Sequence, residues 1–407
     1  MNLKYLALVF ATFCIVAGAD AQPKKSKKAA EEKKATYEFT TVKTSPITSI
    51  KNQNRSGTCW SFSTIAFLES EAIKKGTADT TLNLAPMFPV YKCYLDKADK
   101  YIRMDGTINF AGGGAANDVT YVLKNYGIVP ENVMTGLNYG EEKHVHGELD
   151  ALTKSFVDVI VKNPNRKLSP AWKVAYEGIL KAYLGNIPEK FSVNGKEYTP
   201  ISYAKALGLN ADEYIEITSY THHPFYTQFT LEVADNWQGS KYYNVPMNEM
   251  MEIIDNALEN GYTIAWGTDV SEKGFTRDGI GIVADVEANE KSAGSDQARW
   301  VGANKEDKNA ALYNLNAPGK EKVITQKMRQ DAFDSKETTD DHGMQIFGIA
   351  KDQNGTKYYM VKNSWSTNSK YKGIWYVSVP FVQYKTMDIM INKAAIPDSI
   401  KTKLGIK

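Results

Sequence analysis

The sequence predicts an α+β protein in which a helical region near the N-terminus precedes a region rich in strands. In residues 59–76, apolar side chains recur at helical spacing until a glycine ends the pattern. Residues 342–363 form two apolar runs on either side of Asn354-Gly355, a strong hairpin turn. Between these regions, helical patterns are broken by Pro and Gly, and we expect strands at "EYIEITSY" and "YTIAWGTDV".

The composition is that of a folded globular protein. The chain has 407 residues, of which 43% are hydrophobic and 24% are charged. This balance excludes a largely disordered chain, and the length allows two or more packed units.

The N-terminus carries the features of a signal peptide. "MNLKYLALVFATFCIVAGADAQ" has one lysine, then an apolar run, then the small-x-small pattern of Ala19-Asp20-Ala21. The run is shorter than the ~20 apolar residues that span a bilayer, so we expect cleavage before Gln22 and not a membrane anchor. The sequence therefore predicts export to a periplasmic or extracellular location, with no stable membrane insertion.

A short basic arm follows the predicted cleavage site. In "QPKKSKKAAEEKKA" six lysines oppose two glutamates, while the net charge of the whole chain is only +2. Such a run is usually a solvated tether, and we expect no nucleic-acid partner.

Removal of the signal leaves Cys59 and Cys93. In an oxidising compartment the two could form a disulfide, which is the structural alternative to a reactive thiol. The position of Cys59 favours the thiol, because it lies in the first turn of the predicted helix. Unpaired N–H groups and the helix dipole there are expected to lower the pKa of the thiol and increase its reactivity.

Gln53 lies six residues upstream in a polar, turn-prone segment. Its amide and the backbone N–H of Cys59 provide two donors that can stabilise an acyl-transfer oxyanion. A loop glutamine is otherwise usually exposed to solvent.

A thiolate nucleophile needs a base, and His342 is the best placed of the five histidines because it opens a strand. A hairpin brings Asn363 beside it as an orienting acceptor, and Trp365 can cover that hydrogen bond. The other four histidines lie in "EEKHVHGE" and "SYTHHPFY". These pairs lack the further spaced ligands of a metal site, so we expect no metal.

The order Gln53, Cys59, His342, Asn363 resembles the papain-type cysteine peptidases, and "SGTCW" matches their C-G-x-C-W pattern except for Ser56. Within these peptidases, the chain is similar to the bleomycin hydrolase or aminopeptidase C branch. Cys59 and His342 are 283 positions apart, whereas a papain-sized enzyme has roughly 130 to 150, so the excess is an insertion. Its segments 112–134, 219–250 and 258–275 are similar to that branch.

The resemblance implies a papain-like two-lobe fold with a large helical insertion and a cleft that holds an extended peptide. Gly112 and Gly113 match glycines at the edge of this cleft, and they otherwise form a flexible loop. The implied parts are a signal peptide (1–21), a basic arm (22–40), a left lobe (41–120), the insertion (121–290), a right β lobe (291–393) and a C-terminal arm (394–407). Within them, we expect a long polar surface excursion at 289–340.

The resemblance further implies hydrolysis of peptide bonds through a thioester, without a cofactor, and a homo-oligomer that is a hexamer in that branch. Aminopeptidases of the branch bind the substrate amine with the carboxylate of a C-terminal arm. This chain ends differently, in "AAIPDSIKTKLGIK", yet fourteen extended residues span roughly 45 Å and can reach a cleft. Aminopeptidase action is therefore favoured. The alternatives are a papain-like endopeptidase, a non-peptidase amidase and a catalytically silent peptide-binding protein.

Overall fold

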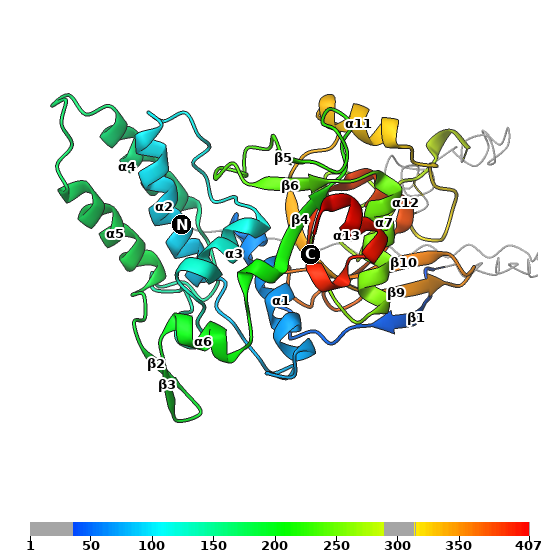
Figure 1. Ribbon diagram of the computed structural model, residues 1–407, viewed down its shortest axis with the longest axis horizontal. Coiled ribbons are helices and arrows are strands. Elements are labelled where there is room, and N and C mark those ends of the chain that lie inside the picture. The colour runs from blue at the N-terminus through cyan, green and yellow to red at the C-terminus, as the bar shows by residue number, and fades with distance from the viewer. Residues whose placement is uncertain (1–35, 289–312, 314, 407) are drawn as a thin grey trace, which may run out of the picture. The chain divides into compact units, whose positions relative to one another are not determined.

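A mainly helical part of the chain comes before most strands of a large sheet in the computed structural model, which describes residues 36–288, 313 and 315–406 (Figure 1). All of these residues belong to the compact unit Thr36–Lys407. The predicted signal peptide, most of the basic arm and much of the polar region 289–340 lie outside the described residues. Tyr37 is buried and a strand begins at Phe39, so packed structure starts before the boundary expected at residue 40.

Six helices and a small hairpin form the helical part, which runs from the left to the middle of Figure 1. They are α1 (Cys59–Lys74), α2 (Met87–Arg103), α3 (Ala116–Asn125), α4 (Gly147–Val161), α5 (Ala171–Leu184) and α6 (Pro200–Ala206), with β2 (Phe191–Val193) paired to β3 (Lys196–Tyr198). One hydrophobic cluster joins them, and its fully buried members include Phe67, Tyr91, Val119 and Leu149. The helix predicted from Cys59 is confirmed.

Ten strands form one sheet within the described residues. They are β1 (Phe39–Thr44), β4 (Tyr214–Thr218), β5 (Gln228–Thr230), β6 (Lys241–Asn244), β7 (Ile264–Thr268), β8 (Ile280–Gly281), β9 (His342–Asp352), β10 (Lys357–Lys362), β11 (Ile374–Ser378) and β12 (Thr386–Asn392). Their order is β5-β6-β4-β12-β7-β9-β10-β11-β8, and β1 also pairs with β9. Both strands predicted inside the insertion are confirmed, as β4 and β7. They belong to the same sheet as β9, so this part of the insertion is integral to the sheet.

Alternation along β9 gives the sheet two different faces. Gln345 points toward α1, where its Nε2 donates to the carbonyl of Ala66 at 3.0 Å. Met344 and Ile346 point the other way, into a second core that contains Ile254 of α7 (Met247–Glu259). The remaining elements are α11 (Gln326–Asp334), α12 (Val379–Lys385), α13 (Asp398–Leu404) and the 3-10 turns η1 (Ala211–Glu213) and η2 (Lys393–Ala395).

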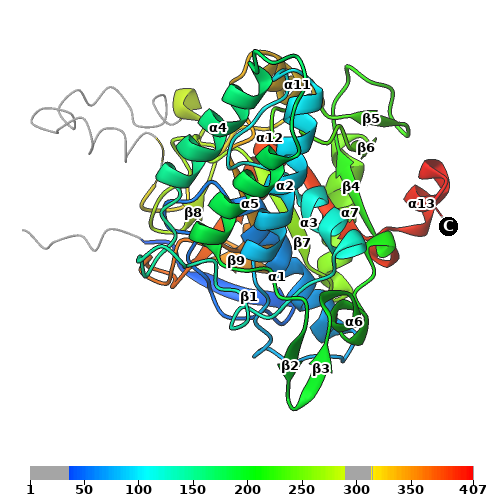
Figure 2. The same ribbon diagram turned by 90° about the vertical axis from the view of Figure 1, so that its left-hand side faces the viewer.

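The C-terminal segment is not the extended arm that its length allowed. It forms η2 and α13, which lies beside α7 (Figures 1 and 2). Ile400 and Leu404 are buried in the second core, and Lys403 pairs with Glu249 at 2.6 Å. Burial of this apolar stripe holds the segment on the sheet face opposite α1. Among the described residues, no helix combines the length and apolarity that a membrane span requires.

Candidate active site

Cys59 is the first residue of α1, as predicted, and its half-buried thiol is free. The loop before it is fixed by Gln53, whose backbone N–H donates to the carbonyl of Ser364 at 2.9 Å. Cys93 is a free, buried thiol on α2, so the alternative of a disulfide between the two cysteines is not realised.

His342 opens β9, and Asn363 directly follows β10, the next strand of the predicted hairpin. Nε2 of His342 donates to Oδ1 of Asn363 at 2.8 Å. Because an amide oxygen only accepts hydrogen bonds, the neutral imidazole must carry its proton on Nε2. Nδ1 is then unprotonated and can act as an acceptor. The ring of Trp365 stacks on the imidazole with centroids 4.6 Å apart, as expected for a cover over this hydrogen bond.

Cys59 and His342 line the same cavity. Gly343 makes this approach possible, since a Cβ atom on it would lie 2.7 Å from Oγ of Ser63 and 3.3 Å from the Cys59 carbonyl oxygen. The backbone N–H of Gly343 also lowers the pKa of the Cys59 thiol, which places it near the sulfur. The absence of a side chain at residue 343 therefore lets the strand that carries the imidazole touch the helix that carries the thiol.

The electrostatics differ from the expected lowered pKa of the thiol. The pKa of Cys59 is raised to about 12, chiefly by burial and also by Asp340 and Asp235, while the N–H groups of Gly343 and Trp60 act in the opposite direction. Burial lowers the pKa of His342 to about 4, although the hydrogen bond to Asn363 acts in the opposite direction. Desolvation is the largest influence on both groups, so the unliganded pair is a neutral thiol and a neutral imidazole in one cavity.

Gln53 is buried, not exposed, and its side chain is held at both ends. Its Oε1 accepts from Oγ of Ser364 at 2.6 Å, and its Nε2 donates to the carbonyl of Ser56 at 2.9 Å. An amide carries two N–H bonds, so one remains for a ligand. The backbone N–H of Cys59 donates to no acceptor among the described residues.

Within the glycine run 112–114, Gly114 lines the cavity, with Ala115 and Ala116 after it, whereas Gly112 and Gly113 do not. The carbonyl of Gly112 accepts from Nε1 of Trp60 at 3.0 Å. A Cβ atom on Gly113 would lie 2.0 Å from a carboxylate oxygen of Asp235. The two predicted glycines thus pack behind the cavity wall, and the helix expected after them begins at Ala116.

Carboxylates that the sequence reasoning missed line the same cavity: Asp235, Asp340, Asp341 and Asp388. Two signals were present. "TTDDHG" places two acids directly before His342, and "MDIMI" contains a single charge inside an apolar strand.

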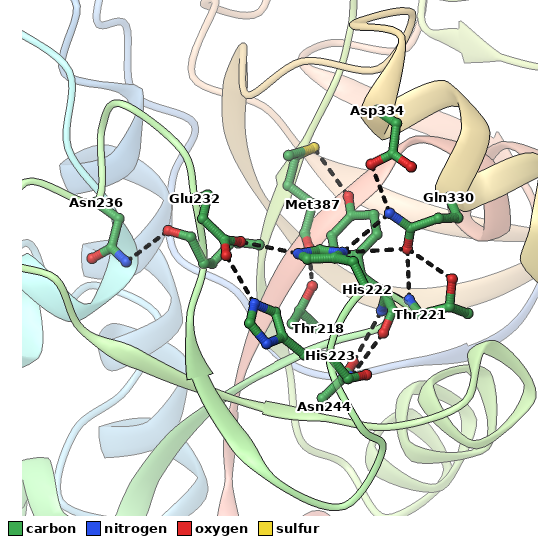
Figure 3. Close-up of polar contacts among 12 residues, drawn as sticks. Thr218, Thr221, His222, His223, Glu232, Asn236, Asn244, Gln330, Asp334 and Met387 are labelled. Atoms are coloured by element: carbon green, nitrogen blue, oxygen red, sulfur yellow. Dashed lines mark hydrogen bonds and ion pairs between the residues drawn. The ribbon is translucent and has the colours of Figure 1, made fainter.

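The other histidines lie in two clusters away from this cavity. His144 and His146 are buried, and desolvation lowers the pKa of both. His222 and His223 both face Glu232, with Nε2 atoms 3.0 and 2.8 Å from its carboxylate oxygens (Figure 3). Glu232 is thus a third group of metal-ligating type, which the sequence reasoning did not find.

Comparison with known proteins gives the family. Residues 35–178 match the model of the papain family cysteine proteases, and residues 188–313 and 294–406 match that of the peptidase C1-like family.

Three relatives illustrate the likeness. Aminopeptidase E of Lactobacillus helveticus is 23% identical over 397 residues, which cover 86% of this chain and 82% of the relative. Aminopeptidase G of Lactobacillus delbrueckii subsp. lactis is 22% identical over 393 residues, with the same coverage of both chains. The crystal structure of PepW from Lactobacillus rhamnosis HN001 (DR20) is similar with a TM-score of 0.66 at 19% identity. The match covers 90% of this chain and 84% of the PepW chain, and it supports the papain-like fold. The chain therefore belongs to the papain family of cysteine peptidases, in the branch that contains the C-type aminopeptidases.

Proposed function

We propose that the protein is a cysteine aminopeptidase, in which Cys59 is the nucleophile and His342 the general base. One observation carries this assignment: the thiol lines a cavity with an imidazole whose Nε2 is fixed on Asn363. A free Nδ1 beside a thiol is the arrangement that activates a cysteine for acyl transfer.

The reaction follows from the protonation states of the pair. The Cys59 proton moves to Nδ1 of His342 as the sulfur attacks the peptide carbonyl carbon. The developing oxyanion accepts from the Cys59 backbone N–H and the remaining N–H of Gln53. The imidazolium then protonates the leaving amine, which gives a thioester and a shortened peptide. His342 next deprotonates a water that hydrolyses the thioester and regenerates the thiol.

Removal of N-terminal residues is favoured over internal cleavage because the similar proteins are named aminopeptidases E, G and C. A silent peptide-binding protein is disfavoured, since each position of the expected constellation is occupied. A non-peptidase amidase does not account for the match over nearly the whole chain. The link to bleomycin hydrolase itself stays a prediction.

The test uses Cys59→Ala with Cys93→Ala as the matched control. Cys59→Ala is expected to abolish hydrolysis of leucyl-aminomethylcoumarin and labelling by a thiol-directed epoxide, whereas Cys93→Ala keeps both. Undiminished turnover by Cys59→Ala refutes the nucleophile. Faster wild-type cleavage of acetylated peptides than of free-amine peptides supports the endopeptidase alternative instead.

Two further proposals rest on the sequence. Export predicts that the mature protein begins at Gln22, and N-terminal sequencing of secreted or periplasmic material tests this. A homo-oligomer, hexameric by family resemblance, is tested by the mass of the purified protein in solution.

A further inference from the structure

Asp388 is a buried carboxylate without a hydrogen-bond donor. Its side chain is 7% exposed, and it accepts no hydrogen bond from any residue that the structure describes. The nearby cation, Arg329, donates instead to the carbonyls of Ser219 and Gln383. A buried carboxylate in this state is costly unless a cationic ligand completes it.

The sheet register points Asp388 at the catalytic thiol. Asp388 on β12 pairs with Gly267 on β7, and Gly267 pairs with Gly343 on β9, so the three share one face. A Cβ atom on Gly267 would lie 2.7 Å from Oδ2 of Asp388, so the carboxylate leans over this glycine toward Gly343. Gly343 in turn contacts Cys59. Helix α1 packs on Gly343, the Asp388 carboxylate lies over Gly267, and Asp388 and Cys59 line one cavity.

The spacing of these three strands suits the amine of an N-terminal residue. Two strand spacings put the Cα atoms of Asp388 and Gly343 about 10 Å apart. Because the Asp388 side chain extends over Gly267, its carboxylate is closer to Gly343 than its Cα atom is. In a reacting complex the carbonyl carbon lies about 3 Å from the sulfur, and the α-amine about 2.5 Å beyond that carbon. An ammonium–carboxylate contact adds about 2.8 Å, so a carboxylate that binds the amine should have its oxygen about 8 Å from the sulfur. A lysine side chain would place its charge four methylene groups farther away.

Charge also selects a cation over a neutral peptide. Asp340, Asp235 and Asp341 line the same cavity, and Asp340 also accepts no hydrogen bond from the described residues. Burial raises the pKa of all three, so a cationic ligand would favour their ionised form and a neutral peptide backbone would not. Among the described residues, only His222, His223 and Glu232 converge closely enough to hold a metal ion, so this acidic set favours an organic cation.

Helix α13, in the C-terminal segment, does not occupy this place, because it packs in the second core on the opposite face of the sheet. We propose that Asp388, assisted by Asp340, binds the free α-amino group of the substrate. This inference rests on the proposed aminopeptidase function and names the residue that replaces a terminal carboxylate.

The test compares two substrates that differ only in the amine: leucyl-aminomethylcoumarin and its des-amino analogue, isocaproyl-aminomethylcoumarin. Asp388→Asn is expected to lower kcat/KM for the leucyl substrate at least about tenfold, as for loss of a charge-assisted hydrogen bond. The des-amino substrate should change by less than about twofold. Asp388→Glu, which keeps the charge, should retain most of the preference for the amine. Asp331→Asn, the same change on an exposed acid of α11, is the control.

Equal losses on both substrates, or no loss on the leucyl one, would overturn the proposal. If Asp388→Asn lowers kcat/KM only for acetyl-lysyl-leucyl-aminomethylcoumarin, the cavity binds a basic side chain of the substrate. That result would also overturn the proposal. The proposed function fails separately if wild-type enzyme prefers acetylated substrates. Folding of Asp388→Asn is checked by its melting temperature. Burial raises the pKa of Asp388 from 3.8 to about 7, so ionisation of this carboxylate destabilises the folded state above pH 7. Asp388→Asn removes this cost, and the variant should therefore have a melting temperature no lower than that of the wild type at pH 8.

Discussion

Gln53 shows how one side chain can serve two purposes. One N–H of its amide holds the turn at Ser56, and the other is free to meet an oxyanion. Gln53→Ala should lower kcat on the order of 10² to 10³ with little change in KM, because the contact strengthens only in the transition state. Gln353→Ala, in the exposed hairpin turn, is the control. Steady-state kinetics that give a loss below about threefold would remove Gln53 from the site.

Because His342 has a low pKa, we expect the rate to persist to an unusually low pH. Its pKa of about 4 lies below the ordinary value of 6.5 because the ring is buried. The imidazole accepts a proton only while it is neutral, so the rate should fall as the pH drops through about 4 and stay level between 5 and 7. Inactivation by iodoacetamide, a neutral reagent, measures this over pH 3 to 7. A midpoint near 6.5 would show that burial does not shift this group.

At the scale of elements, the packing of α13 determines where the C-terminal segment lies. Ile400 is 1% exposed in the second core, and Ile400→Ala should lower the free energy of unfolding by about 2 to 4 kcal/mol. Thr402→Ala, on the exposed side of the same helix, should change it by less than about 0.5 kcal/mol. Urea denaturation of both variants measures the difference, and similar values would mean that α13 is not packed.

The same helix predicts how the protein tolerates a C-terminal tag. A Gly-Ser extension after Lys407 would interfere with substrate binding if the terminal carboxylate bound the amine. Since α13 packs beside α7, the extension should leave the ratio of free-amine to acetylated turnover within about twofold. Loss of free-amine preference in the tagged protein would restore the model of an arm in the cleft.

For the whole folded unit, activity depends on the contact between α1 and the sheet. Gln345 is fully buried, and its Nε2 donates to the Ala66 carbonyl and to Oγ of Ser70 at 2.8 Å. Gln345→Met keeps the volume but leaves these acceptors unpaired, so it should destabilise the fold by about 1 to 3 kcal/mol. It should also lower kcat, because the spacing of Cys59 and His342 is set across this contact. Calorimetry and kinetics on the same sample test both effects, with Gln353→Ala as the control.

Local patterns were sufficient to predict much of the fold and several parts of the candidate site. The helix at Cys59, the hairpin at Asn354-Gly355 and the strands β4 and β7 follow from spacing and turn chemistry, which act over a few residues. The same patterns were sufficient to expect the bond between His342 and Asn363, because a hairpin fixes which residues lie side by side.

Tertiary structure alone decided the features that depend on burial and on distant pairing. The sequence placed Cys59 at a helix dipole, but desolvation by the rest of the fold sets the direction of its pKa. It allowed the last fourteen residues to extend, but an apolar stripe that fits the second core folds Asp398–Leu404 as α13. Asp388 and Gly343 meet on one face only through the register of three strands from different parts of the chain, which no local pattern specifies.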